Sequence, residues 1–228
     1  MIKRKLSQEG LKTIACVTML LDHIGTVMVP SIGLRVIGRL SFPIYCFLLA
    51  EGTFYTRNRK EYGRRLLLGI ILSEIPFDLL FFGQITWEHQ SVMVTLMLGF
   101  LYAATMTNLP NMGYRLLMLI PFVFLGELLR CDYGGWGVAM VGLFVLTRDT
   151  PHRYLCQALS LGLLGWMIGG KTVSLGILEF PRQVFCMAAM IPIWLYDGHK
   201  ITGNIWIRRM YYLFYPAHLL ALYLIRSI

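Results

Sequence analysis

Long apolar runs, separated by short polar segments, fill most of the chain. The nine longest lie at 11–30, 34–56, 66–86, 91–107, 115–130, 134–147, 154–170, 174–196 and 210–226. The stretch Ser91–Tyr114 shows the pattern clearly, because its 24 residues include no charged side chain and no histidine. A helix needs about 20 apolar residues to cross a bilayer. The pattern therefore predicts an all-α, polytopic transmembrane bundle of about nine spans.

The composition excludes an ordinary water-soluble globule. Hydrophobic residues make up 57% of the chain and charged residues only 14%, whereas soluble domains contain about 25% charged residues. The five cysteines have no CxxC spacing, and no metal-ligand set is predicted. Because the connections are short, we expect residues 1–228 to form a single integral-membrane domain with no separate soluble part. Any chemistry must then lie inside the bundle or on its faces.

The net charge of +9 would suggest a nucleic-acid partner in a soluble protein. In a membrane protein, lysines and arginines hold cytoplasmic loops against anionic lipid. With a cytoplasmic N-terminus, the inner segments contain 14 of them: Lys3, Arg4, Lys5, Arg57, Arg59, Lys60, Arg64, Arg65, Arg115, Arg148, Arg153, Lys200, Arg208 and Arg209. The outer segments contain 4: Arg35, Arg130, Lys171 and Arg226. This bias predicts a multi-pass protein of the cytoplasmic (inner) membrane with its N-terminus inside, membrane lipids as partners and no nucleic acid.

Ionisable side chains within the first span indicate a functional interior. Lys12 and His23 are eleven residues apart, which is within about 20° of three helical turns, so they share one face about 16 Å apart. Charged groups in a bilayer core are unfavourable by about 2.5–3.5 kcal/mol each and mark functional positions. We therefore expect this face to line a shared interior. Asp22 points about 100° away from His23; it either accepts hydrogen bonds from a neighbouring helix or faces the cavity.

The other ionisable residues form two predicted layers. Lys12 and Glu51 lie on the cytoplasmic side, next to a basic turn that contains Arg57, Arg59 and Arg65. The second layer leans outward and comprises His23, Arg39, Asp78 and His218, with Glu74 as a further substrate or second-site candidate. Tyr211, Tyr212, Phe214 and Tyr215 are predicted to form an interfacial aromatic belt.

This arrangement suits acyl transfer across a membrane. A cationic cytoplasmic mouth can hold a phosphate-bearing donor, and a deeper histidine can act as general base towards an amine or hydroxyl. Arg39 can hold an acceptor group or stabilise an oxyanion. The same residues also permit a proton-coupled transporter, in which His23 and Asp78 relay protons.

Several short motifs resemble the TraX family. At the start they are Leu11-Lys12-Thr13-Ile14-Ala15, Met19, Asp22-His23-Ile24-Gly25, Gly38-Arg39-Leu40-Ser41-Phe42-Pro43-Ile44, Ala50-Glu51-Gly52, Thr56-Arg57-Asn58-Arg59, Tyr62, Arg65-Leu66 and Ile75-Pro76-Phe77. At the end they are Tyr212, Phe214-Tyr215-Pro216 and His218-Leu219. The resemblance is specific over residues 11–78 and 210–225 and looser between them.

The resemblance implies an integral-membrane acetyltransferase that uses acetyl-CoA and, in conjugative systems, acetylates the N-terminus of pilin. It also implies kinship with wider membrane acyltransferases in which a Lys or Arg precedes a His by eleven residues. On this basis His23, Asp22, Arg39 and Glu51 are the catalytic candidates. Lys12, Arg57, Arg59 and Arg65 are the donor-binding candidates, and Glu74, Asp78 and His218 are the substrate or second-site candidates.

The predicted function is transfer of an acetyl group from cytoplasmic acetyl-CoA to an acceptor at the membrane or outer side. The acceptor is a pilin or other peptide, a sugar or a small molecule. Two alternatives remain open at this point, namely a proton-coupled transporter and a non-catalytic assembly subunit of a conjugative or surface apparatus.

Overall fold

The computed structural model describes residues 6–106, 109, 111–175, 178–199 and 205–227. The chain divides into two compact units, and each is described by itself. Unit 1 comprises Met1–Tyr45 and Tyr154–Ile228, and unit 2 comprises Cys46–Arg153. The single-domain expectation stays a prediction. Lys3, Arg4, Lys5 and Lys200, which contribute to the predicted charge bias, lie outside the described residues.

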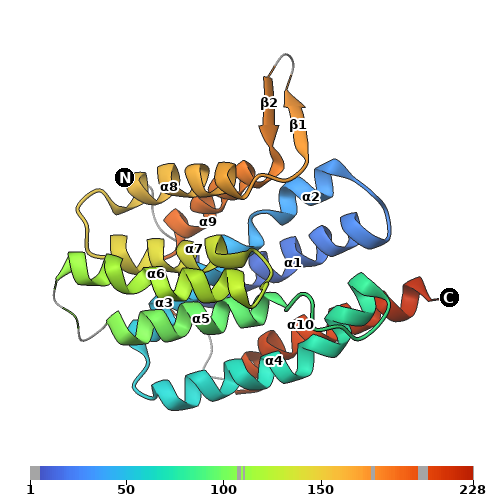
Figure 1. The fold of residues 1–228 in the computed structure, drawn as a ribbon, viewed down its shortest axis with the longest axis horizontal. Helices are drawn as coiled ribbons and strands as arrows, with labels where there is room; N and C mark the ends of the chain where they lie inside the picture. Colours follow the sequence, from blue (N-terminus) through green and yellow to red (C-terminus); the bar gives the residue numbers. More distant parts are fainter. Residues whose placement is uncertain (1–5, 107–108, 110, 176–177, 200–204, 228) are drawn as a thin grey trace. The chain divides into compact units, whose positions relative to one another are not determined.

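Helices build most of unit 1 (Figure 1). Its elements are α1 (Gln8–Val27), α2 (Ile32–Gly38), the start of α3 (Ser41–Tyr55), α8 (Arg153–Ile168), strands β1 (Thr172–Leu175) and β2 (Leu178–Pro181), the 3-10 helix η1 (Arg182–Ala189), α9 (Met190–Leu195) and α10 (Ile205–Arg226). Ser7 caps α1, since its Oγ accepts a hydrogen bond from the Gly10 N–H at 3.0 Å. A turn at Arg39 and Leu40 separates α2 from α3.

Unit 2 is built from the rest of α3 and from four further helices. These are α4 (Arg59–Phe82), α5 (Val92–Met106), α6 (Met112–Leu128) and α7 (Gly134–Thr147). Asn58 and Asn111 cap the N-termini of α4 and α6. Leu98, Cys131 and Val138 form part of the unit's apolar core, where α5 and α6 both pack on α7.

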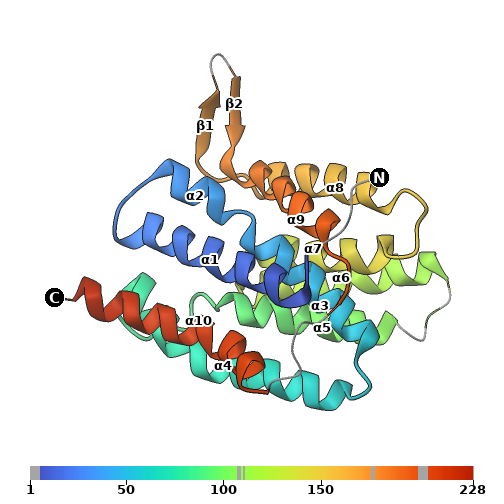
Figure 2. The ribbon, with the colours of Figure 1, turned by 180° about the vertical axis from the view of Figure 1, so that it is seen from behind.

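The predicted bounds of the span at 174–196 were wrong, because the first part of this segment is not helical. This segment forms the antiparallel hairpin β1–β2, with Val173 opposite Phe180, followed by η1 and the short helix α9. Gly169 and Gly170 end α8 with positive φ angles of 71° and 92°, and Pro181 cannot donate a helical hydrogen bond. Apolar content indicated burial here, but it did not determine the secondary structure. Figures 1 and 2 show the hairpin projecting away from the helices of unit 1.

Helices α1 and α10 run side by side in the same direction (Figures 1 and 2). Near their N-terminal ends, Thr13 contacts Tyr211, and towards their C-terminal ends His23 contacts His218. Helix α8 and the η1–α9 segment run in opposite directions, because Leu161 contacts Cys186 and Tyr154 contacts Trp194. The Leu6 N–H just before α1 donates to the Leu195 carbonyl at the end of α9 at 2.9 Å, so the N-termini of α1, α8 and α10 lie at one end of unit 1.

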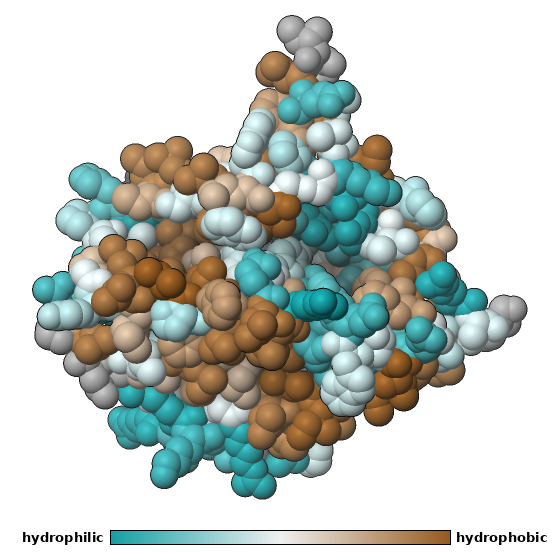
Figure 3. All heavy atoms as spheres, viewed as in Figure 1, coloured by the Kyte–Doolittle hydropathy of each residue, from teal (hydrophilic) through white to brown (hydrophobic). Residues whose placement is uncertain are grey.

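Apolar side chains are exposed along whole helix faces. Leu155, Leu159 and Leu163 follow one face of α8, and Ile120, Phe124 and Leu128 follow one face of α6; each of these side chains is about 60% exposed. Figure 3 shows apolar residues over much of the surface in view, with hydrophilic residues gathered in clusters. Exposed apolar surface of this extent marks an interaction with lipid or with another protein.

Among the described residues, one helical stretch is long and apolar enough to cross a membrane by length and composition. It is the 24-residue stretch Ile32–Tyr55, which contains α2 and α3. A single stretch of this kind also occurs in the cores of soluble proteins. The helical class of the prediction is confirmed, and the number and direction of crossings are considered below as a proposal.

Candidate functional site

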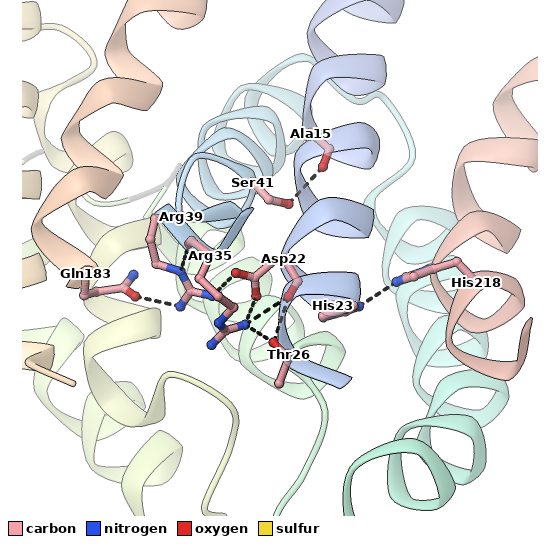
Figure 4. Close-up of polar contacts among 9 residues, drawn as sticks. All are labelled: Ala15, Asp22, His23, Thr26, Arg35, Arg39, Ser41, Gln183 and His218. Atoms are coloured by element: carbon pink, nitrogen blue, oxygen red, sulfur yellow. Dashed lines mark hydrogen bonds and ion pairs between the residues drawn. The ribbon is translucent and has the colours of Figure 1, made fainter. Parts of the chain in front are cut away.

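The polar side chains of α1 point to two opposite sides of the helix. His23 points towards α10, whereas its neighbour Asp22 points towards α2 and η1 (Figure 4). Lys12 also faces α10, with Nζ 5.5 Å from the centre of the Tyr211 ring. The predicted shared face of Lys12 and His23 is therefore confirmed, and so is the divergence of Asp22 from His23.

His23 and His218 form a direct hydrogen bond between their rings. His23 Nδ1 lies 2.7 Å from His218 Nε2, and the two ring planes differ by only 7°. Nitrogens this close cannot belong to rings stacked at van der Waals distance, so the rings lie edge to edge in nearly one plane. His218 Nδ1 lies 2.8 Å from the Phe214 carbonyl oxygen one turn earlier in α10. His218 is buried and His23 is half-buried.

Aromatic side chains surround the histidine pair. The Phe214 ring stacks on His218 with 4.8 Å between centroids, and Tyr215 lies 5.6 Å from His218 and 6.5 Å from His23. Tyr215 is only 7% exposed. The prediction that Tyr215 belongs to an interfacial aromatic belt is therefore wrong, because this residue packs inside unit 1 against the two imidazoles.

Further polar groups continue along the α1–α10 contact towards the start of both helices. Thr13 Oγ1 and the Tyr211 hydroxyl lie 2.9 Å apart, and the Tyr211 hydroxyl donates to the Glu9 carbonyl at 3.2 Å. On α1 between Lys12 and His23, Cys16 Sγ lies 3.1 Å from the Tyr45 hydroxyl. A row of polar side chains thus follows α1 from Lys12 to His23.

Asp22 belongs to a buried ion cluster on the other side of α1. Its carboxylate accepts hydrogen bonds from the guanidinium groups of Arg35 and Arg39, and Arg39 Nη1 donates to Gln183 Oε1 at 2.9 Å (Figure 4). Gly38 makes this approach possible, because a Cβ there would overlap the Asp22 carboxyl group. The cluster contains two cations and one anion, and it joins α1, α2 and η1.

In unit 2, Glu51 forms an ion pair with Arg148. From the sequence, Arg148 was expected only to add to the positive charge of the cytoplasmic segments. Arg148 Nε lies 3.1 Å from Glu51 Oε1, and its guanidinium group lies 4.6 Å from the centre of the Phe54 ring. Gly52 lets the Tyr62 hydroxyl approach, since a Cβ there would be 3.0 Å from that oxygen. The ion pair explains the glutamate at position 51, and the close approach of Tyr62 explains the glycine at position 52.

The prediction of a basic turn is wrong in part, because Arg59 and Arg65 lie in α4 and only Arg57 lies in the turn before it. Arg57 is exposed, whereas Arg59 and Arg65 are half-buried. Arg65 lies over the Tyr62 ring at 5.6 Å. Arg59 Nε is buried and has no hydrogen-bond partner among the described residues.

Glu74 and Asp78 bind the backbone of the loop between α4 and α5. Glu74 accepts hydrogen bonds from the Ser91 N–H at 3.2 Å and from its hydroxyl at 2.6 Å, at the N-terminus of α5. Asp78 Oδ2 accepts from the Thr86 N–H at 2.9 Å, and Asp78 is 3% exposed. These contacts supply a structural role for both carboxylates.

The predicted site residues therefore divide between the units. Unit 1 contains Lys12, Asp22, His23, Arg39 and His218, and unit 2 contains Glu51, Arg57, Arg59, Arg65, Glu74 and Asp78. Within unit 1 the structure joins His23 to His218 and Asp22 to Arg39, and these two groups lie on different sides of α1.

Sequence reasoning missed Arg35, Arg148 and Gln183, whose side chains form ion pairs or hydrogen bonds with candidate residues. Arg35 is four residues before Arg39, which places both on one face of α2 and its turn, and this spacing was a usable signal. Gln183 had no comparable signal, because its position depends on the fold of a segment 144 residues away from Arg39.

These features define a helical protein that exposes apolar helix faces and carries buried ionisable groups along its first helix. The class indicates association with a membrane. The TraX protein family matches residues 7–226, so the chain belongs to this family.

Two relatives show the extent of the similarity. The probable fimbrial assembly protein FimC, serogroup H1, of Dichelobacter nodosus is 28% identical over 228 aligned residues, which cover 92% of this chain and 91% of the relative. The uncharacterized protein RP591 of Rickettsia prowazekii (strain Madrid E) is 26% identical over 155 residues, covering 65% of this chain and 59% of the relative. No solved structure matches the chain.

Proposed function

We propose that this protein is an integral-membrane acetyltransferase that takes an acetyl group from cytoplasmic acetyl-CoA. The observation that supports it most strongly is the half-buried His23, which is hydrogen-bonded to His218 and shares a helix face with Lys12. A histidine held by a second group within reach of an acceptor is the arrangement that general-base catalysis requires.

The proposed reaction uses His23 as the base. The acceptor amine or hydroxyl attacks the thioester carbonyl carbon while His23 removes its proton. The tetrahedral intermediate then loses the CoA thiolate as the carbon–sulfur bond breaks, and the thiolate receives the proton from His23. Lys12 in unit 1 and, separately, Arg57, Arg59 and Arg65 in unit 2 are the groups that would form charge-assisted hydrogen bonds with phosphates.

Asp22, Arg39 and Glu51 have a supporting role in this proposal. Asp22 and Arg39 fix α1 against α2 and so hold His23 in place from the other side of its helix. Glu51 holds Arg148 over the Phe54 and Tyr55 rings at the end of α3. Asp78 and Glu74 shape the loop that follows α4.

We further propose nine crossings of the inner membrane, with a cytoplasmic N-terminus and membrane lipids against the apolar faces. The parallel course of α1 and α10 requires an odd number of crossings if both helices span the bilayer. The η1–α9 segment returns antiparallel to α8 and provides the eighth crossing. The excess of positive charge in the inner segments favours this direction.

The acceptor is proposed to be a peptide of a pilus or fimbria, because the relative in Dichelobacter nodosus is named a probable fimbrial assembly protein. A sugar or a small molecule remains an alternative acceptor. The same name favours a second candidate function, a non-catalytic assembly subunit, in which the His23–His218 pair would serve only the contact between α1 and α10.

A transfer assay separates these functions. The purified protein in detergent is incubated with acetyl-CoA and a pilin-like peptide, and the release of free CoA thiol is measured. We expect His23→Ala and His23→Gln to abolish release, while the exposed control His152→Gln retains it. Full activity in correctly folded His23 variants would exclude His23 as the base, and no CoA release or CoA binding by the unaltered protein would favour the assembly subunit.

A further inference from the structure

We propose that His218 is a positioning residue that sets the tautomer of His23. In this arrangement the proton of His23 lies on Nδ1, and Nε2 carries the basic lone pair. The consequence for catalysis rests on the proposed function, but the tautomer itself does not. His218, a substrate or second-site candidate from the sequence, then has the defined role of orienting His23 and setting its tautomer.

The direction of the two hydrogen bonds fixes the tautomers. The Phe214 carbonyl oxygen can only accept, so His218 Nδ1, 2.8 Å away, must carry a proton. A neutral imidazole with a proton on Nδ1 has a lone pair on Nε2. The single proton between His218 Nε2 and His23 Nδ1, at 2.7 Å, therefore belongs to His23. His23 must then be the tautomer whose Nε2 is the base.

The alternative assignment requires a positively charged His218. Its Nε2–H would then donate to His23, and the basic nitrogen of His23 would be engaged in that bond. His218 is 7% exposed, and none of the described carboxylates forms an ion pair with it. A buried charge without an ionic partner is strongly unfavourable, so the neutral pair is favoured.

The geometry is suited to a relay of hydrogen bonds. The rings are nearly coplanar, so the Nδ1–H of His23 points along the lone pair of His218. The stacked Phe214 ring and the buried Tyr215 restrict rotation of His218. When Nε2 of His23 gains the acceptor proton, its Nδ1–H becomes a stronger donor, and His218 and the Phe214 carbonyl stabilise the charge in turn.

The tautomer can be read directly by nitrogen NMR. The protein is labelled with 15N-histidine and measured in detergent above the ordinary histidine pKa, and signals are assigned with His23→Gln and His218→Gln. We expect protonated Nδ1 and unprotonated Nε2 for both His23 and His218. In His218→Phe, which keeps a ring but removes the acceptor, the proton of His23 should move to Nε2 in at least part of the population. A proton on Nε2 of His23 in the unaltered protein would overturn the proposal.

An activity series tests the consequence. His218→Phe should lower kcat about 10- to 100-fold while the KM for acetyl-CoA changes less than about threefold, because only the base is affected. His218→Gln should recover most of kcat, since its amide oxygen can accept the His23 proton at the same position. Equal kcat in all three proteins, or equal losses in both variants at unchanged melting temperature, would exclude positioning by His218. The expected tautomer in a protein without transferase activity would refute the proposed function alone.

Discussion

At the residue scale, Asp22 shows how buried charges hold the first two helices together. Its carboxylate faces the guanidinium groups of Arg35 and Arg39, and all three side chains are largely removed from solvent. Removing one partner from a buried ion cluster leaves the opposite charge uncompensated. The cluster therefore depends on Asp22 more than on either arginine, because two cations would otherwise face each other.

Asp22→Asn should lower the free energy of unfolding by about 3–5 kcal/mol. Unfolding can be followed with a thiol-reactive dye, because Cys16, Cys46, Cys131 and Cys186 are buried in the folded protein. Asp149→Asn is the control, since the Asp149 side chain is 74% exposed and should contribute less than about 0.5 kcal/mol. An Asp22→Asn protein as stable as Asp149→Asn would contradict a structural role for the cluster.

The surroundings of His89 predict that the stability of unit 2 depends on pH. The Asp132 carboxylate, 3.9 Å from Nε2, raises the pKa of His89, and the charges of Glu74 and Asp78 add to the rise. A pKa that is higher in the folded state contributes stability below the ordinary value of about 6.5, and this contribution is lost as the pH rises through the raised pKa.

His89→Gln should therefore lower the melting temperature more at about pH 5.5 than at about pH 8.5. His152→Gln, which removes an exposed histidine of the same unit, is the matched control. An equal loss for His89→Gln at both pH values would mean that the ion pair with Asp132 does not contribute.

The exposure of Arg57 predicts that its proposed contact with CoA depends on the salt concentration. If Arg57 binds a CoA phosphate, Arg57→Ala should weaken CoA binding by a larger factor at low salt than at high salt, because salt screens exposed charges. Lys171→Ala, in the connection before β1, is the control and should leave binding unchanged at either salt concentration. A dissociation constant that Arg57→Ala does not change would remove Arg57 from the donor site.

At the element scale, close contacts at glycine fix how α8 meets η1. A Cβ at Gly165 would lie 2.6 Å from the Gln183 carbonyl oxygen, which is backbone and cannot move aside without shifting η1. A Cβ at Gly162 would meet only the flexible end of Met187, at 3.7 Å. The two positions lie on the same helix but tolerate a methyl group differently.

Gly165→Ala should destabilise the protein by about 1–3 kcal/mol, as overpacking does. Gly162→Ala should be neutral or stabilising by about 0.5 kcal/mol, because alanine favours helix more than glycine does. Both can be compared by the same thiol-based unfolding measurement. Equal effects at the two positions would argue against the close approach of α8 and η1.

At the scale of the whole molecule, the proposed nine crossings place the two ends of α8 on opposite sides of the membrane. The exposed Ser174 in β1 would then face outward, and the exposed Glu61 in α4 would face the cytoplasm. In a variant with Cys156 replaced, Ser174→Cys should react with a membrane-impermeant maleimide in whole cells. Glu61→Cys should react only after permeabilisation, and the reverse pattern would refute the proposed orientation.

The sequence alone determined the helical class, the family resemblance and the common face of Lys12 and His23. Apolar runs and helical periodicity depend on neighbouring residues, so both can be interpreted without a fold. The resemblance at residues 11–78 and 210–225 agrees with membership of the TraX family over residues 7–226.

Only the tertiary structure decided which side chains meet. His218 lies 195 positions from His23, and Gln183 lies 144 positions from Arg39. It also decided that residues 172–181 form a hairpin, since apolar content is shared by buried helices and strands. The partners of His23 and Asp22 depend on how helices distant in the chain pack, and this packing is set by many contacts together rather than by the spacing of any one motif.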